Sequence, residues 1–245
     1  MASLGVRELL DLPIELSRLI HDFAFRPGLG AHPERIALPM PLNSANDSVQ
    51  AVAIERGLLG PAAGPLDAER CLGQIDWQSP LHRIALLPRE ILEALAWYLG
   101  LAAFRDRLRR VVMRDELRTL HAQGLSAEHL AFVYQIPDDP GSKGGSTGAA
   151  AVLRESATST WPQRIQAQGW SILGELREVL PASIAARFQL KLPPEAPSVA
   201  GDEPPLAPND PRFEWVRERV VAAWRPDFDS RLSALASRSG RRAQA

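Results

Sequence analysis

The sequence predicts an all-α fold, an irregular bundle of helices joined by long loops that are rich in proline and glycine. Apolar residues recur at steps of three and four, as in Ile91, Leu95, Leu99 and Ala102, which is the spacing of one buried helix face. Proline and glycine cluster between such windows and separate them. Alternation of apolar and polar residues is limited to FQLKLP at 188–193, where we expect at most a short extended segment.

Composition limits the classes of function. A chain of 245 residues with 45% hydrophobic content can bury a sizeable core. A formal net charge of −1 argues against bulk attraction to nucleic acid or to an anionic membrane. The single Cys71 excludes an intrachain disulfide framework and suits the cytoplasm. The longest uncharged apolar run, Ala94–Phe104, is eleven residues, against roughly 20 for a membrane-spanning helix. We therefore expect a cytoplasmic protein.

Residues 1–80 are predicted to form an N-terminal arm of short helices and proline- and glycine-rich loops. One helix is expected at about 13–25, where apolar residues recur with helical spacing before a Pro-Gly pair. A second, shorter helix is expected near 47–59, and residues 71–80 have the composition of a loop.

Residues 81–192 are predicted to form the helical core. The core begins with LHRIALLP at 81–88, an apolar run too short to distinguish a strand from an extended lead-in. The main helix follows, with Pro88 in its first turn, where a missing N–H is tolerated. Its pattern continues past Gly100 to Val112, and there arginines alternate with the apolar residues.

Shorter helices complete this core. Asp115 is a candidate N-cap for one of them, and Gly124 a candidate left-handed stop. Ser126 then starts the next helix. Thr160 precedes a longer amphipathic helix, which Pro181 ends or kinks.

The C-terminal part is predicted to consist of a linker and two helices. Residues 193–212 are rich in proline and acidic or small residues, which is typical of a stiff, extended linker. Residues 213–245 are expected to pack on the core through a helix at 213–224 and a short helix after Pro226, followed by a frayed basic tail.

The stretch PDDPGSKGGSTG at 137–148 is predicted to be a flexible surface loop. It is no phosphate-binding loop, because Lys143 is followed by Gly144 instead of serine or threonine and no buried strand precedes it. Asp138 and Asp139 are adjacent in this turn, which disfavours a paired acid–base role.

Other candidate chemistry is equally weak. His121, His129 and Glu128 lie on two short predicted helices without the i, i+4 spacing that directs two imidazoles at one metal ion. Nothing around Cys71 indicates a lowered thiol pKa. The sequence therefore predicts no enzyme, no cofactor and no metal site.

The arginine cluster is the strongest candidate contact surface. Arg107, Arg110, Arg114 and Arg118 recur at intervals of three and four, so one helix would present them as a single ridge. The alternative is a solvated helix face with intrahelical ion pairs. Trp215 is expected to be exposed, since it falls off the apolar face of its predicted helix, and tryptophan is enriched in interface hot spots.

Three segments resemble the SctK (YscK) family of type III secretion systems. The first contains GLAAF at Gly100–Phe104 and LRRVV at Leu108–Val112. The second is Ile165–Pro193, a glycine-containing amphipathic helix, a proline break and an exit similar to R-x-L-x-L-P. That exit is carried by Arg187, Leu190, Leu192 and Pro193. The third is Val216–Leu232, a helix broken by proline.

This resemblance implies a mostly α-helical adaptor without catalysis at the cytoplasmic face of the inner membrane. In the family, the adaptor links the cytoplasmic domain of the inner-membrane ring protein (SctD) to the spoke protein (SctQ) of the sorting platform. Two alternatives stay open. One is a helical nucleic-acid-binding or regulatory protein that uses the Arg105–Arg118 basic ridge, and the other is a helical enzyme.

Overall fold

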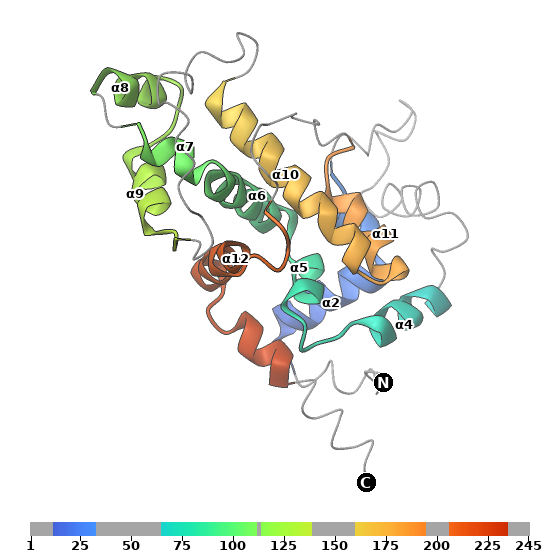
Figure 1. Ribbon diagram of the computed structural model, residues 1–245. Coiled ribbons are helices and arrows are strands. Elements are labelled where there is room, and N and C mark those ends of the chain that lie inside the picture. The colour runs from blue at the N-terminus through green and yellow to red at the C-terminus, as the bar shows by residue number, and fades with distance from the viewer. Residues whose placement is uncertain (1–11, 33–64, 112–113, 139–159, 195–205, 235–245) are drawn as a thin grey trace. The chain divides into compact units, whose positions relative to one another are not determined.

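A computed structural model describes residues 12–32, 65–111, 114–138, 160–194 and 206–234 (Figure 1). Within these ranges every regular element is a helix, which confirms the all-α prediction. No helix of the described ranges is both long and apolar enough to cross a membrane. The helix expected near 47–59, most of the loop at 137–148 and the C-terminal tail lie outside the described residues.

The chain divides into two compact units, each discontinuous in sequence. Unit 1 takes its described residues from Met1–Leu92, Leu176–Glu195 and Val221–Ala245. Unit 2 takes them from Glu93–Glu175 and Ala196–Val220. The sequence pattern instead predicts consecutive segments, with a boundary near residue 80 and a linker at 193–212.

Unit 1 is built from short helices around a small apolar core. Its main elements are α2 (Ile14–Phe25), the 3-10 helix η1 (Pro27–Gly30), α4 (Pro65–Gln74), α5 (Pro80–Leu86) and α11 (Ala182–Lys191). Helix α11 packs against α4, α5 and η1, and α2 packs against α4 and α5. Leu16, Ile20, Ile84 and Phe188 are fully buried between them.

Two buried arginines of unit 1 are held by hydrogen bonds. Arg187 on α11 is 2% exposed and donates to the backbone oxygens of Ala24 (3.3 Å) and Ser183 (3.1 Å). Arg83 on α5 donates to the backbone oxygen of Asp229 and to Ser233 Oγ, both at 2.7 Å. These contacts offset the cost of taking the two charges out of water.

Unit 2 is built on two long helices. Its elements are α6 (Arg89–Ala103), α7 (Arg105–Arg109), α8 (Arg114–Ala122), α9 (Ala127–Gln135), α10 (Trp161–Val179) and α12 (Pro211–Trp224), of which α6, α10 and α12 also contribute residues to unit 1. One cluster of apolar side chains joins α6 to α10. Its buried members include Leu101, Phe104, Leu108, Leu130 and Ile165.

Helices α6 and α10 approach closely at two glycines. A Cβ built on Gly100 of α6 would lie 2.0 Å from the backbone oxygen of Ile165, and one built on Gly169 of α10 would lie 1.6 Å from the backbone oxygen of Ala96. Real Cβ atoms do not approach backbone atoms so closely, so each helix needs a glycine where the other passes.

Several predicted helix boundaries are confirmed. Ser126 caps α9, since its Oγ accepts the backbone N–H of His129 at 3.2 Å while the His129 ring accepts the backbone N–H of Ser126 at 3.2 Å. This reciprocal pair is a capping box. Gly124 has φ of +99° after α8, as a left-handed stop requires. Pro181 separates α10 from α11.

Three local predictions are wrong. Residues 71–74, predicted as loop, end helix α4, and 81–86, predicted as strand or lead-in, belong to α5. Helix α5 begins with Ser79 as N-cap and Pro80 at its first position, a start signal that the apolar run obscured. Residues 188–191, predicted as extended, continue α11, because its buried face includes Phe188.

Candidate interaction surface

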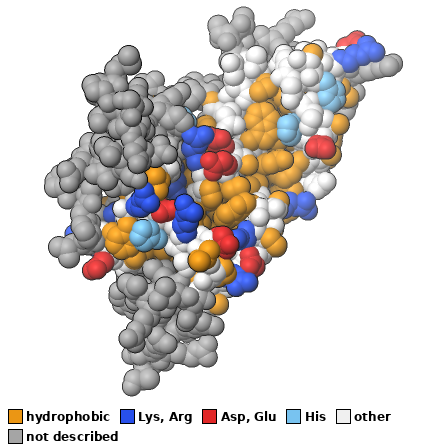
Figure 2. Space-filling view, turned by 180° about the vertical axis from the view of Figure 1, so that it is seen from behind, with side chains coloured by type: hydrophobic (Ala, Val, Ile, Leu, Met, Phe, Trp, Pro, Cys, Tyr) orange, Lys and Arg blue, Asp and Glu red, His pale blue; other side chains and the backbone are white. Residues whose placement is uncertain are grey.

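Five aromatic rings of unit 2 form a connected row that we call the aromatic stripe. Its members are Trp97 and Tyr98 on α6, His129 and Phe132 on α9, and Trp215 on α12. Neighbouring ring centroids lie 4.5–6.4 Å apart, the range in which aromatic pairs attract each other. All five side chains are half-buried. Hydrophobic side chains also gather beside histidines on one face in Figure 2.

Trp215 is part of this stripe and not, as predicted, an exposed side chain. Its ring lies 5.3 Å from that of Phe132, and the Arg219 guanidinium lies 4.3 Å from its centroid. Arg219 also donates to Gln135 Oε1 at 2.8 Å, so it ties α12 to the end of α9. The stacked cation covers one ring face, while the side chain as a whole stays partly open to solvent.

The other end of the stripe contains a polar atom without a partner. Trp97 Nε1 is buried and has no hydrogen-bond acceptor among the described residues. A buried N–H of this kind costs free energy unless an acceptor is supplied.

The two histidines considered as metal ligands stabilise helix ends. His129 takes part in the capping box, and burial lowers its pKa from 6.5 although Glu128 opposes the shift. His121 Nδ1 lies 2.7 Å from the backbone oxygen of Leu125, so this nitrogen carries the proton. No group of three His, Cys, Asp or Glu side chains with the geometry of a metal site is found among the described residues.

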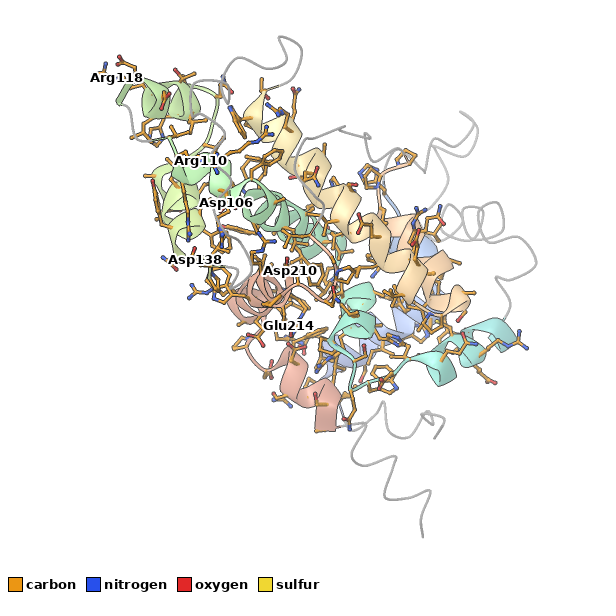
Figure 3. All side chains as sticks on the ribbon, viewed as in Figure 1. Asp106, Arg110, Arg118, Asp138, Asp210 and Glu214 are labelled. Atoms are coloured by element: carbon orange, nitrogen blue, oxygen red, sulfur yellow. The ribbon has the colours of Figure 1, made fainter. Side chains whose placement is uncertain are left out.

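Unit 2 also carries charged side chains on α7, α8 and α12 and in the segments next to α9 and α12. Figure 3 labels six of them: Asp106, Arg110, Arg118, Asp138, Asp210 and Glu214. They come from segments that are far apart in sequence but belong to the same unit. The surface therefore carries both signs of charge.

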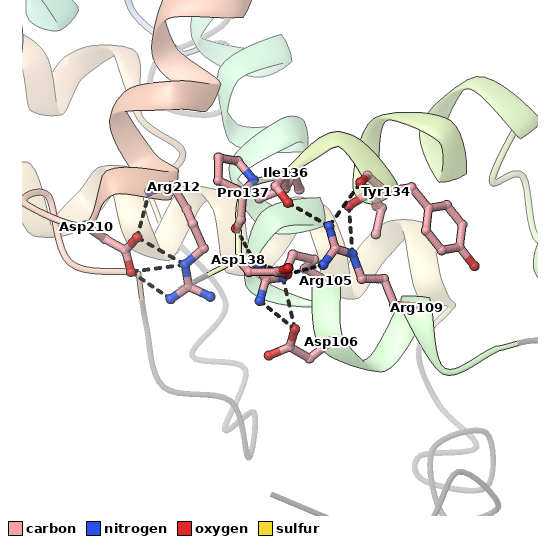
Figure 4. A network of polar contacts seen from close by, with 10 residues as sticks. Arg105, Asp106, Arg109, Tyr134, Ile136, Pro137, Asp138, Asp210 and Arg212 are labelled. Atoms are coloured by element: carbon pink, nitrogen blue, oxygen red, sulfur yellow. Dashed lines mark hydrogen bonds and ion pairs between the residues drawn. The ribbon is translucent and has the colours of Figure 1, made fainter. Parts of the chain in front are cut away.

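Arg109 caps the end of α9 (Figure 4). Its guanidinium donates to the backbone oxygens of Val133 (3.2 Å), Tyr134 (3.0 Å) and Ile136 (2.6 Å). It also pairs with Asp138 at 2.5 Å. The last carbonyls of a helix have no intrahelical donor, and a cation placed there also complements the helix dipole.

Arg105 is the buried member of the same network. Its side chain is 3% exposed and pairs with Asp106 at 2.9 Å. It also donates to the backbone oxygen of Pro137 and lies 3.7 Å from Asp138. Asp138, which the sequence placed in a loop turn, is thus an ion-pair partner of two arginines.

The predicted arginine ridge does not lie on one helix. Arg107 and Arg110 belong to α7 and its C-cap, whereas α8 begins only at Arg114, whose side chain is outside the described residues. Arg118 lies on α8 and pairs with Asp115 at 3.3 Å. The helix breaks at Phe104 and again after Arg109, so the regular spacing in sequence does not become one line of side chains.

A second set of ion pairs lies at the start of α12. Arg212 donates to both carboxylate oxygens of Asp210, at 2.7–3.2 Å. Burial would raise the pKa of Asp210, but the hydrogen bonds and charge of Arg212, with the charge of Arg105, hold this pKa below 3.8. Arg217 forms a similar bidentate pair with Glu214.

The sequence singles out one ring of the stripe, Trp215, and does not indicate how the five rings meet. Trp97, Tyr98 and Phe132 lie in segments that are predicted as helices, where nothing in the sequence distinguishes them from other apolar residues. Their half-burial is a tertiary property, because it depends on how α6, α9 and α12 meet.

Comparison of the chain with protein-family models, with curated proteins and with solved structures found no match.

Proposed function

We propose that this protein is a non-enzymatic adaptor of a bacterial type III secretion system. It would link the cytoplasmic domain of the inner-membrane ring protein (SctD) to the spoke protein (SctQ) of the sorting platform. It would act in the cytoplasm, at the inner membrane when assembled.

The observation that carries an adaptor role is the aromatic stripe with its charged surroundings. Tryptophan, tyrosine and arginine are the residues most enriched in protein–protein hot spots. The stripe offers two half-buried tryptophans, Trp97 and Trp215. Arg219 stacks on Trp215, and a charged side chain at such a surface can help select a partner through complementary charge.

The assignment to this family is supported by the positions of the resembling segments. Gly100 lies in the first segment and Gly169 in the second, and these are the two glycines at the α6–α10 crossing. The resemblance therefore covers residues with a stated packing role and not only a pattern of apolar positions. The all-α fold agrees with what the family implies.

The test is co-purification with the spoke protein and with the cytoplasmic ring domain encoded in the same genome. The proposal predicts a stable complex with both, whose mass gives the stoichiometry. Recovery of neither folded partner would contradict it. Binding to duplex DNA with a steep salt dependence would instead favour the nucleic-acid alternative.

Two pairs of variants locate the contact within that complex. Trp215→Ala should weaken binding to one partner, and Trp224→Ala is its control, a half-buried tryptophan at the other end of α12. Charge reversal of Arg107 and Arg110 should act similarly, with Arg70→Glu on α4 as an exposed control. Circular dichroism checks that each variant folds. Equal binding by the test and control variants would exclude this surface.

A further inference from the structure

Unit 1 contains a pocket of about 330 Å³ between α2, η1, the first turn of α6 and the end of α11. Leu19, Phe23 and Leu29 provide apolar walls. Its volume lies at the lower end of the range of small-molecule sites, about 300–1,000 Å³. This size suits a ligand smaller than a nucleotide.

Lys191 is the buried charge of this pocket. It is 5% exposed, and its Nζ donates to the backbone oxygens of Ala85 and Leu87, both at 2.9 Å. The same Nζ lies 5.0 Å from the centroid of Phe23, which also lines the pocket. The aliphatic part of the Lys191 side chain passes Gly30. A Cβ built on Gly30 would lie 3.4 Å from Cε of Lys191.

The hydrogen bonds of Lys191 leave one N–H of its ammonium without an acceptor among the described residues. An ammonium has three N–H donors, and the described residues supply two acceptors. Burial lowers the pKa of Lys191 from 10.5 to about 7, and the charge of Glu90 only partly opposes this shift. The charge of Glu90 therefore does not offset the cost of burying the Lys191 ammonium.

The remaining charges of the pocket lie nearer to solvent. Asp22 on α2 is paired with Arg18 at 3.6 Å. Glu90 on α6 is exposed and Arg89 beside it is half-buried, while η1 contributes no charged residue. The pocket therefore combines one buried cation with more exposed charges of both signs.

We propose that this pocket binds a small monocarboxylate with a short apolar chain. The carboxylate accepts the third N–H of Lys191, a charge-assisted hydrogen bond in a dry site. The apolar chain packs against Leu19, Phe23 and Leu29. A single negative charge matches the single buried cation, whereas a dianion would also face Asp22 and Glu90.

The chain makes this inference easy to test, because Lys143 and Lys191 are its only lysines. In the Lys143→Arg variant every lysine side-chain NMR signal comes from Lys191. Protein labelled with ¹³C,¹⁵N-lysine then reports the pKa of Lys191 directly. The probes are 4-methylpentanoate and, as matched control, its uncharged amide 4-methylpentanamide.

The expected result is that 4-methylpentanoate raises the Lys191 pKa by about one unit or more, since a tenfold preference for the ammonium form corresponds to one unit. The amide should leave the pKa unchanged. By linkage, the acid should bind more weakly as the pH rises above the pKa of the free pocket.

Three outcomes would overturn the proposal. The Lys191 signal stays unchanged at roughly millimolar acid, the acid and the amide bind equally, or the acid binds equally well to a Lys191→Met variant that retains its helical circular dichroism. None of these results bears on the adaptor role, which concerns residues of unit 2.

Discussion

Gly169 lies so close to Ala96 that a Cβ on the glycine would stand 1.6 Å from the backbone oxygen of the alanine. The same holds in the other direction: a Cβ on Gly100 would stand 2.0 Å from the backbone oxygen of Ile165. Backbone atoms cannot rotate out of the way as a side chain can. The separation of α6 and α10 is therefore set by two hydrogen-sized side chains.

Gly169→Ala should destabilise the protein by about 1–3 kcal/mol or more, because the extra methyl forces the two helices apart. Gly100→Ala should behave alike. Urea unfolding measures the change in the free energy of unfolding.

Gly174→Ala is the matched control for this experiment. It lies on the same helix α10, and its Cβ would meet nothing within 4 Å. Alanine is the better helix former, so this variant should gain up to about 1 kcal/mol. A loss at Gly174 equal to that at Gly169 would mean that glycine is needed in α10 for some other reason than the crossing.

Local features of the fold were predictable from the sequence. Ser126 and Gly124 mark helix ends through their own backbone preferences, and both occur where they were expected. The same reasoning failed for α5, because a seven-residue helix with an apolar run resembles a buried strand. There the serine–proline start was the better guide than the pattern that followed.

The candidate sites depend on contacts that no sequence window contains. Arg109 meets carbonyls 24 to 27 residues further along the chain. Lys191 meets carbonyls more than 100 residues before it. An arginine-rich window therefore predicted a ridge, while the structure uses Arg105 and Arg109 to hold α9.

Arg109→Met should cost about 2–3 kcal/mol of stability, because it leaves three carbonyls at the end of α9 without their donor and removes a cation from that helix end. Methionine keeps the apolar stem, so the loss reports the guanidinium. The measurement is again urea unfolding.

Arg118→Met is the comparison for this variant. The Arg118 side chain is 65% exposed, and its ion pair with Asp115 at 3.3 Å is solvated. Such pairs contribute at most about 1 kcal/mol. If both variants lost the same stability, the capping role of Arg109 would be refuted.

His129 makes unit 2 sensitive to acid. The folded protein lowers the pKa of this histidine, so below pH 6.5 the unfolded chain binds a proton that the folded chain does not. Stability should therefore fall as the pH drops below 6.5, until the folded-state pKa is reached. Protonation also removes the ring acceptor of the capping box.

His129→Gln should reduce this acid sensitivity, since glutamine completes a capping box but does not titrate. Unfolding at several pH values, for the wild type and the variant, gives the comparison. His82 contributes a decline of the same sign, so it must be retained in both proteins. An unchanged slope in the variant would show that the acid sensitivity arises elsewhere.

Lys191 should make the free energy of unfolding depend on pH in the alkaline range. Its pKa is about 7 in the folded protein against 10.5 ordinarily, so between these values the unfolded chain holds a proton that the folded chain has released. Stability then rises with pH across this interval, by up to about 1.4 kcal/mol per pH unit. Lys191→Met should flatten this rise, whereas Lys143→Arg, which retains Lys191, should preserve it. A rise of equal slope in Lys191→Met would mean that Lys191 stays charged when buried, because only a proton lost on folding can couple stability to pH in this direction.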